Sequence, residues 1–236
     1  MSSGRYKTIN WKVKDQIGQI ILNQPPTNYM DNKFFNELGD LVKNVIPNTG
    51  LNAILVSGKG RHFSSGADLN DLLTNLLEHV PKSVHGVQDP MPDFLLDNLD
   101  TFRFFKKLEF PVISVITGVC LGAAFELALN CHIRICAENS LLGLPESSFN
   151  LLPGLGGIQN VLMLTNPKKT FEIVLGGHNF TAQEAQEWQL VDKVLDRNEV
   201  FNYANQLARF IGPGYSSIRK KKYLLDFDKS LTPSGL

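Results

Sequence analysis

Two glutamates lie where a carboxylate has no evident structural task. Glu126 falls within the apolar, small-residue run Gly-Ala-Ala-Phe-Glu-Leu-Ala, and Glu146 follows Gly-Leu-Pro, shortly before the glycine-rich segment 153–157. Removing a carboxylate from water is costly unless the group is paired or used in chemistry. Two such acids beside glycine-rich turns predict an acid/base pair that faces one cleft. For Glu146 the alternative is an acid at a helix N-terminus, where the helix dipole favours negative charge.

Two segments are typical of strand-to-helix turns built from small residues. They cover residues 62–69 (His-Phe-Ser-Ser-Gly-Ala-Asp-Leu) and 118–126 (Gly-Val-Cys-Leu-Gly-Ala-Ala-Phe-Glu). The first N–H groups of a helix lack an intrahelical acceptor, and small side chains let a ligand approach them closely. N–H groups from two such turns would form an oxyanion hole if they converge. The alternatives without a ligand are a polar turn with Asp68 at a helix start and close helix–sheet packing.

The composition argues against several other classes of function. The 23 basic and 23 acidic residues balance, so no overall field favours nucleic acid or an anionic membrane. Cys120, Cys131 and Cys136 lack disulfide or metal-ligand spacing and are expected to be reduced core residues. The histidines also lack metal spacing, and no apolar run approaches the roughly 20 residues of a membrane span. The N-terminus has no secretory signal, which favours a cytoplasmic location.

Strands and helices are expected to alternate around these residues. Hydrophobic periodicity predicts a strand pair in 6–22 and strands at 53–56, 111–116, 133–135, 141–142 and 191–195. It predicts helices at 34–45, from about residue 68, at 94–108 and around Glu126. A surface loop is expected at 79–94, and helices at 157–165, 167–175, 181–188, 197–211 and 214–226. The alternation predicts an α/β fold with a helical C-terminal part.

Taken in order, these segments resemble the enoyl-CoA hydratase/isomerase, or crotonase, superfamily. The matching segments are 22–28 (Leu-Asn-Gln-Pro-Pro-Thr-Asn), the Ser-Gly-Ala-Asp-Leu turn, the strand 111–118, the Glu126 helix, 134–139, Leu-Pro-Glu with Pro-Gly-Leu-Gly-Gly, and 182–192. The resemblance covers nearly the whole chain. It implies a crotonase-like spiral, a superhelix of ββα units, with a core at 1–190. It also implies a short helical C-terminal region at 191–236 that takes part in trimerisation.

The resemblance implies that an acyl thioester of coenzyme A binds in the cleft. The N–H groups of Ala67 and Ala123 would hold the thioester oxygen, and Gly154 matches a glycine that helps to orient the site. Both family glutamates are retained, as Glu126 and Glu146, which favours hydration of a 2-enoyl thioester or dehydration of a 3-hydroxyacyl thioester. By this resemblance Glu126 would activate water and Glu146 would deliver a proton to Cα.

Coenzyme A enters as part of the substrate, and no separate cofactor or metal is expected. The turn at Ser64, Ser65, Ala67, Asp68 and Leu69 would hold the adenine and pantetheine, and Lys222 matches a C-terminal lysine of the family. A solvated basic helix face is the alternative for the run that contains Lys222. An acyl-carrier-protein thioester is the alternative substrate. The family resemblance also implies a homotrimer or a hexamer formed as a dimer of trimers.

Two other functions fit the same residues. The segment between Asp68 and Pro111 is longer than in typical relatives and lies where the acyl pocket is shaped. This length favours another crotonase-type reaction, such as enoyl isomerisation, decarboxylation or tailoring of a carrier-bound acyl group. Gln24, which stands where the family has an arginine, and the short C-terminal region favour a non-catalytic homologue that binds coenzyme A.

Overall fold

The computed structural model of the chain describes residues 5–79 and 91–211. Within these residues, the main sheet has the strand order β1-β2-β3-β4-β6-β9. Its strands are β1 (Ile9–Lys14), β2 (Ile17–Leu22), β3 (Ala53–Gly58), β4 (Val112–Ile116), β6 (Ile133–Ala137) and β9 (Lys193–Leu195). β1 and β2 pair antiparallel, and the other neighbouring strands pair parallel. A smaller sheet joins β5 (Val119–Leu121), β7 (Leu141–Gly143) and β8 (Phe180–Thr181).

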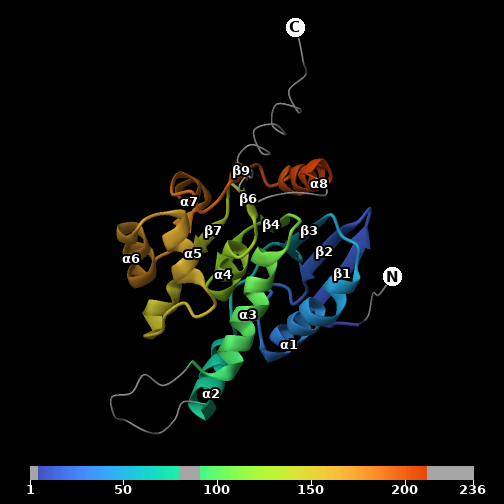
Figure 1. Cartoon of the computed structure of the whole chain (residues 1–236). Coiled ribbons are helices and arrows are strands. Elements are labelled where there is room, and N and C mark those ends of the chain that lie inside the picture. The colour runs from blue at the N-terminus through green and yellow to red at the C-terminus, as the bar shows by residue number, and fades with distance from the viewer. Residues whose placement is uncertain (1–4, 80–90, 212–236) are drawn as a thin grey trace.

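Helices surround the main sheet. They are α1 (Asn32–Asp40), α2 (Leu69–His79), α3 (Asp93–Lys107), α4 (Ala123–Leu129), α5 (Gly157–Leu164), α6 (Pro167–Gly176), α7 (Ala182–Glu187) and α8 (Val200–Ile211). A π-helical turn, Leu41–Val45, and a 3-10 turn, Ile46–Asn48, continue α1, and a 3-10 helix covers Pro145–Phe149. Figure 1 shows α5, α6 and α7 at one side of the molecule, α1 with β1 and β2 at the other, and α4 between them.

The central strands are buried on both faces. Every residue of β3, β4 and β6 is buried, which is typical of parallel strands covered by helices on both sides. Alternate side chains enter two separate cores: Ile54 packs in a cluster with Phe125 of α4, whereas Leu55 packs with Leu207 of α8. The site-bearing helix α4 and the helix α8 are therefore held by opposite faces of one sheet.

The antiparallel pair β1–β2 closes through a two-residue turn. Asp15 and Gln16 both have positive φ angles, 53° and 60°, as a type I′ hairpin turn requires. This turn matches the right-handed twist of the flanking strands. The strand pair expected in residues 6–22 is confirmed.

The α/β alternation expected from the sequence is confirmed, with differences at element ends. The first helix starts at Asn32, two residues before its first predicted apolar position, because the Asp31 side chain caps it by accepting the Phe34 N–H. The predicted loop 79–94 is shorter, since His79 still belongs to α2 and α3 begins at Asp93. Residues 80–90 lie outside the described residues.

Two late elements also start after their predicted positions. β9 begins at Lys193, since the N–H of Val191 still donates to Ala185 O. α8 begins at Val200, after a turn in which the N–H of Glu199 donates to Asp196 O. Because β9 and α8 join the main sheet and its cover, residues 191–211 pack with the rest of the described chain. The predicted helix at 214–226 and the remaining part of the trimerisation region lie outside the described residues.

The three cysteines are buried and unbridged, as expected. All three lie in the hydrophobic cluster that also contains the apolar side chains of α4. Over residues 5–79 and 91–211, no helix has the combined length and apolar character needed to cross a bilayer.

Leu207 tests how strongly α8 is bound to the sheet. Leu207 is fully buried, so Leu207→Ala removes apolar contacts and leaves a cavity. We expect the free energy of unfolding to fall by about 2–5 kcal/mol, measured by urea denaturation. Gln206→Ala, at the exposed neighbouring position, is the control and should change it by less than about 0.5 kcal/mol. Equal effects of the two variants would show that α8 is not held by this contact.

Candidate active site

The turn before α2 leaves one N–H group without an acceptor in the described chain. The N–H groups of Ser64, Ser65, Gly66 and Asp68 donate, respectively, to Val119 O, Thr27 O, Ser64 Oγ and Met30 O. Ala67 forms a parallel bridge with Met30, so its own N–H points away from that neighbour. Because the surrounding N–H groups are all used, the turn is fixed while the Ala67 N–H is available to a ligand.

The turn before α4 lies directly beside the first one. Ser64 bridges to Cys120 of β5, and Gly66 has a φ of +96° that glycine adopts readily. A Cβ added to Gly66 would lie 2.6 Å from the carbonyl oxygen of Leu121 and 3.5 Å from the nitrogen of Ala123. A side chain at residue 66 would therefore separate the two turns. The Ala123 N–H, the first of α4, also has no acceptor among the described residues.

The two turns open onto one cavity of about 540 Å³. Its lining includes Ala67 and Ala123, both candidate glutamates and Gly154. Segments far apart in the sequence thus surround a single space, with main-chain donors and two carboxyl groups at its wall. This convergence is the geometric condition that an acid/base site with an oxyanion hole requires.

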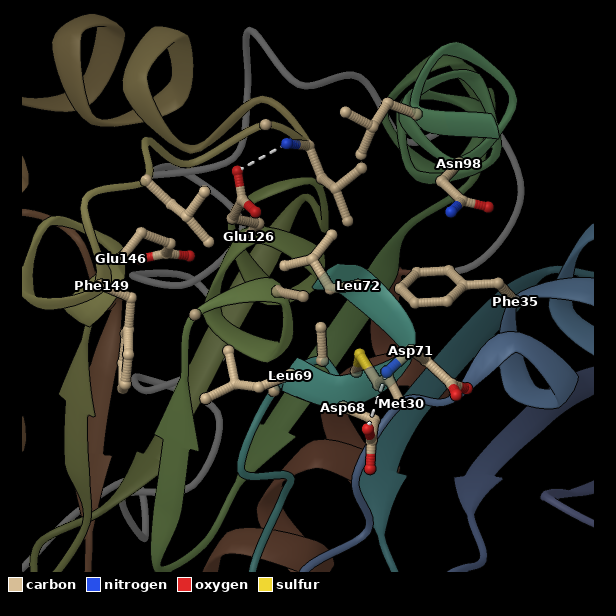
Figure 2. A pocket seen from close by; sticks show the side chains of 18 of the residues that line it. Met30, Phe35, Asp68, Leu69, Asp71, Leu72, Asn98, Glu126, Glu146 and Phe149 are labelled. Atoms are coloured by element: carbon tan, nitrogen blue, oxygen red, sulfur yellow. Dashed lines mark hydrogen bonds between the residues drawn. The ribbon is translucent and has the colours of Figure 1, made fainter. Parts of the chain in front are cut away.

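Glu126 is held by main-chain donors from the glycine-rich segment. Its Oε1 accepts the N–H groups of Leu155 and Gly157, each at 2.8 Å, and the residue is 2% exposed. Figure 2 shows one of these two hydrogen bonds. A Cβ at Gly157 would lie 2.9 Å from the same oxygen. The absence of a side chain there lets the α5 N-terminus approach the carboxyl group. Asn130 ties the two segments together by donating to Glu126 O and Leu155 O.

Glu146 approaches the same space from the 3-10 helix Pro145–Phe149. Its Oε2 is buried and has no hydrogen-bond partner in the described chain. Its Oε1 lies beside the α4 start, where a Cβ at Gly122 would come within 3.2 Å of it. Gly122 has a φ of +54° and directly precedes the free N–H of Ala123. Glu146 therefore contributes an unpaired carboxyl oxygen next to the proposed oxyanion donors.

Burial shifts the protonation of both glutamates. Desolvation and the neighbouring Glu146 carboxylate raise the pKa of Glu126 to about 8, although its two N–H donors act in the opposite direction. Desolvation also raises the pKa of Glu146 to about 7. Two adjacent carboxyl groups with such pKa values share one proton near neutral pH, since the second charge would be repelled by the first. One acid and one base can then coexist in the cavity.

The structure brings most of the sequence-predicted site residues together. Glu126, Glu146, Ala67, Ala123, Gly154, Ser65, Asp68 and Leu69 all line the cavity. Asp68 also acts as the cap of α2, because its Oδ1 accepts the N–H groups of Asn70 and Asp71. The sequence analysis gave a helix start as the alternative role of Asp68. The Asp68 carboxylate has that role, since it caps α2.

Two of the predicted contact residues are not placed in the cavity wall. Ser64 is fully buried and its hydroxyl accepts the Gly66 N–H, so its side chain supports the turn from behind and does not line the cavity. Its own N–H and C=O bond to β5, which leaves neither for coenzyme A. Lys222 lies outside the described residues.

Sequence reasoning missed the wall opposite the glutamates. Figure 2 shows Phe35 and Asn98 across the cavity from Glu126 and Glu146, with Leu72 between them. These three side chains come from α1, α3 and α2. Their spacing in the sequence carries no signal, because only the packing of three helices brings them together. The described residues contain no group of three or more His, Cys, Asp or Glu side chains arranged to hold a metal ion.

Comparisons with known proteins agree with this geometry. The family model for enoyl-CoA hydratase/isomerase matches residues 12–222. The 2,3-dehydroadipyl-CoA hydratase of Escherichia coli (strain K12) is 31% identical over 190 residues, which are 80% of this chain and 69% of that protein. The carnitinyl-CoA dehydratase of Salmonella agona (strain SL483) is 29% identical over 192 residues, 81% of this chain and 69% of the relative.

The fold is also similar to solved structures. A structure of a candidate enoyl-CoA hydratase from Thermobifida fusca YX, in complex with acetoacetyl-CoA, superposes with a TM-score of 0.75. The sequences are 21% identical, and the match covers 97% of this chain and 89% of that one. At this identity the match shows that the two chains share a fold.

The raised pKa values predict a pH dependence of stability. Both glutamates bind protons more strongly in the folded chain than at their ordinary pKa of 4.5. The folded chain therefore holds more protons than the unfolded one between about pH 4.5 and pH 8, and its stability falls as the pH rises through that window. Glutamine at position 126 has no charge at any pH, like the protonated acid. In Glu126→Gln the fall in the free energy of unfolding over this pH range should therefore be smaller by on the order of 2 kcal/mol.

Urea denaturation of both proteins at about pH 5.5 and about pH 8.5 measures this difference. Exposed Glu187→Gln serves as the control and should follow the wild type. An equal change in the free energy of unfolding between the two pH values, in wild type and Glu126→Gln, would contradict a raised pKa at Glu126.

Proposed function

The chain belongs to the enoyl-CoA hydratase/isomerase (crotonase) family, and we propose that it interconverts 2-enoyl and 3-hydroxyacyl thioesters by adding or removing water. The single observation that carries this proposal is the position of two carboxyl groups, the buried Glu126 and the half-buried Glu146, over one cavity. Its similarity to a hydratase and a dehydratase of CoA thioesters supports the same reaction class. Retention of both acids favours water addition over reactions that need one acid or none.

In this proposal, the N–H groups of Ala67 and Ala123 bind the thioester carbonyl oxygen. Addition of water at Cβ moves electrons toward that oxygen, so an enolate-like charge develops there in the transition state. Two main-chain donors fixed in advance stabilise this charge without reorganisation, and one such donor is worth about 3–4 kcal/mol in other enzymes. The neighbouring N–H groups of the first turn are already paired, which keeps the donor directed into the cavity.

The two glutamates have different supports, which favours different tasks. Two N–H groups fix the Glu126 carboxyl, so we assign to it the orientation and deprotonation of water. In this reactive form the proton that the pair shares is on Glu146, although the pKa of Glu126 is the higher of the two. Glu146 has an unpartnered Oε2, so we assign to it the delivery of a proton to Cα. The water oxygen forms a bond to Cβ while the π bond between Cα and Cβ breaks, and one water proton passes to Glu126. The proton of Glu146 is transferred to Cα, where it forms a C–H bond. Dehydration runs through the same steps in reverse.

The proposal includes coenzyme A as part of the substrate and no separate cofactor. Ser65, Asp68 and Leu69 line the cavity beside Ala67 and are the residues proposed to meet the pantetheine arm. A carrier-protein thioester presents the same arm and is the alternative substrate. Trimeric or hexameric assembly and a cytoplasmic location are further expectations from the family resemblance.

Substitution of either glutamate tests the acid/base assignment. We expect Glu126→Gln and Glu146→Gln each to lower the rate of crotonyl-CoA hydration by about 10²–10⁴-fold, because amides cannot exchange the proton. The loss of enoyl absorbance measures the rate, and a branched, aromatic and longer enoyl-CoA panel extends the test. Glu187→Gln, on the exposed face of α7, should retain full activity.

Mass spectrometry of the products separates the competing reactions. Hydration adds one water to the thioester, decarboxylation removes carbon dioxide, and isomerisation leaves the mass unchanged. Full activity in both glutamine variants, or tight CoA binding without turnover of any enoyl thioester, would overturn the proposal.

The main-chain N–H of Ala123, one of the two proposed oxyanion donors, can be removed by a single substitution at residue 123. Ala123 is the first residue of α4, a position that tolerates proline, and proline has no N–H. Ala123→Pro should lower kcat by about 10²–10³-fold. Ala123→Gly keeps the donor and should remain within about tenfold of wild type. Similar kcat values for the proline and glycine variants would exclude this N–H from the reaction, provided that circular dichroism shows both variants folded.

A further inference from the structure

One wall of the cavity is formed by α1, α2 and α3. Phe35, Leu72, Leu76, Phe94, Leu95 and Asn98 line it. Leu95 contacts the region of Gly154, since a Cβ there would lie 3.9 Å from Leu95 Cδ2. The acyl group of a thioester held at the N–H donors would have the leucine and phenylalanine side chains of this wall within the same space.

All ionisable side chains in the described wall are acids. They are Asp68, Asp71, Glu126 and Glu146, and no lysine, arginine or histidine of the described residues lines the cavity. Asp71 is fixed with its Oδ2 accepting the N–H of Asn32. Lys106, on the last turn of α3, is turned elsewhere and donates to Asn160 Oδ1 at 2.6 Å. A negative group on the substrate would therefore meet like charge, and no counter-ion, among the cavity-lining residues of 5–79 and 91–211.

Asn98 is the polar side chain of α3 in this wall. It lies three and four residues after Leu95 and Phe94, on the same helix face, and Figure 2 shows it above the ring of Phe35. Its amide has no hydrogen-bond partner among the described residues. An uncharged amide at this place can meet a neutral chain or a polar group, but it cannot neutralise a carboxylate.

We propose that the acyl subsite between α2 and α3 selects uncharged acyl groups and excludes acyl groups that end in a carboxylate, with Asn98 as the position that decides this. The proposal rests on the function proposed above and names its substrate class. Moving a carboxylate from water to an apolar wall costs free energy that only a cationic partner would recover. An uncharged chain of the same length gains from burial against leucine and phenylalanine side chains.

The test compares two saturated thioesters that bind but cannot be hydrated. Hexanoyl-CoA and adipoyl-CoA have six-carbon acyl groups and differ only in a terminal methyl or carboxylate. Calorimetry on the full-length wild type should show hexanoyl-CoA binding at least about 100-fold more tightly, which corresponds to about 2.7 kcal/mol. Comparable affinities, or a preference for adipoyl-CoA, would overturn the proposal.

A cation placed on the wall should reverse part of this selectivity. In Asn98→Lys the ratio of the two affinities should fall at least about tenfold, since the ammonium group can pair with the terminal carboxylate. Leu77→Lys adds the same charge to the 81% exposed position on α2, outside the cavity, and should leave the ratio unchanged. An equal fall of the affinity ratio in both variants would show that the selectivity follows the overall charge of the protein. It would contradict the role of Asn98.

Kinetics separate this inference from the proposed reaction. 2-Hexenoyl-CoA and 2,3-dehydroadipyl-CoA are the matching unsaturated pair, and kcat/KM should differ in the same direction. If neither is hydrated but hexanoyl-CoA binds selectively, the selectivity stands and the hydratase proposal fails. If both are hydrated equally well, the hydratase proposal stands and the selectivity fails. Failure of both saturated thioesters to bind would overturn this inference together with the CoA-thioester site. The thermal stability of Asn98→Lys shows whether that variant is folded, and the wild-type comparison tests the proposal without it.

Discussion

The buried carboxyl group of Glu126 is the constraint on which the site depends. Its Oε1 receives two N–H groups from the segment that starts α5, so the helix bearing Glu126 and the glycine-rich turn must be held in register. Gly157 permits that approach, and Asn130 secures it by bonding to both segments. A carboxyl group this well buried retains its proton more readily than one in water, because no cation offsets the desolvation.

Three other polar groups of the cavity have no hydrogen-bond partner in the described chain. The N–H groups of Ala67 and Ala123 lack acceptors in the described chain, and Oε2 of Glu146 lacks a donor there. Buried polar groups are ordinarily paired, so the unpaired, buried Oε2 of Glu146 beside two main-chain donors without acceptors in the described chain favours a ligand at this place. The buried strands on both sides of these turns provide the rigidity that keeps the groups in place.

The two halves of the cavity differ in character. On one side, main-chain donors and carboxyl groups come from the turn before α2, from α4 and its start, and from the 3-10 helix after β7. On the other side, apolar side chains and Asn98 come from α1, α2 and α3. The first half holds the groups to which the proposed reaction is assigned, whereas the second half would surround the proposed acyl group. The long segment between Asp68 and Pro111, noted from the sequence, supplies α2 and α3 of that second half.

Local sequence patterns predicted the strands of the main sheet, most helices and the two glutamates, because an acid in an apolar helix and glycine-rich turns are visible within a few residues. Ala67, Ala123 and Gly154 were expected from the family resemblance, and the short strands β5 and β8 were missed. Element ends were less accessible, as at Asp31, where a side-chain cap extends α1 beyond the apolar pattern. The family resemblance grouped Ser64 with the residues expected to contact coenzyme A, but its β-bridge to Cys120 leaves its side chain fully buried behind the turn. Only the tertiary structure placed Phe35, Leu72 and Asn98 in one wall, since contacts among three separate helices depend on packing and leave no periodic trace in the chain.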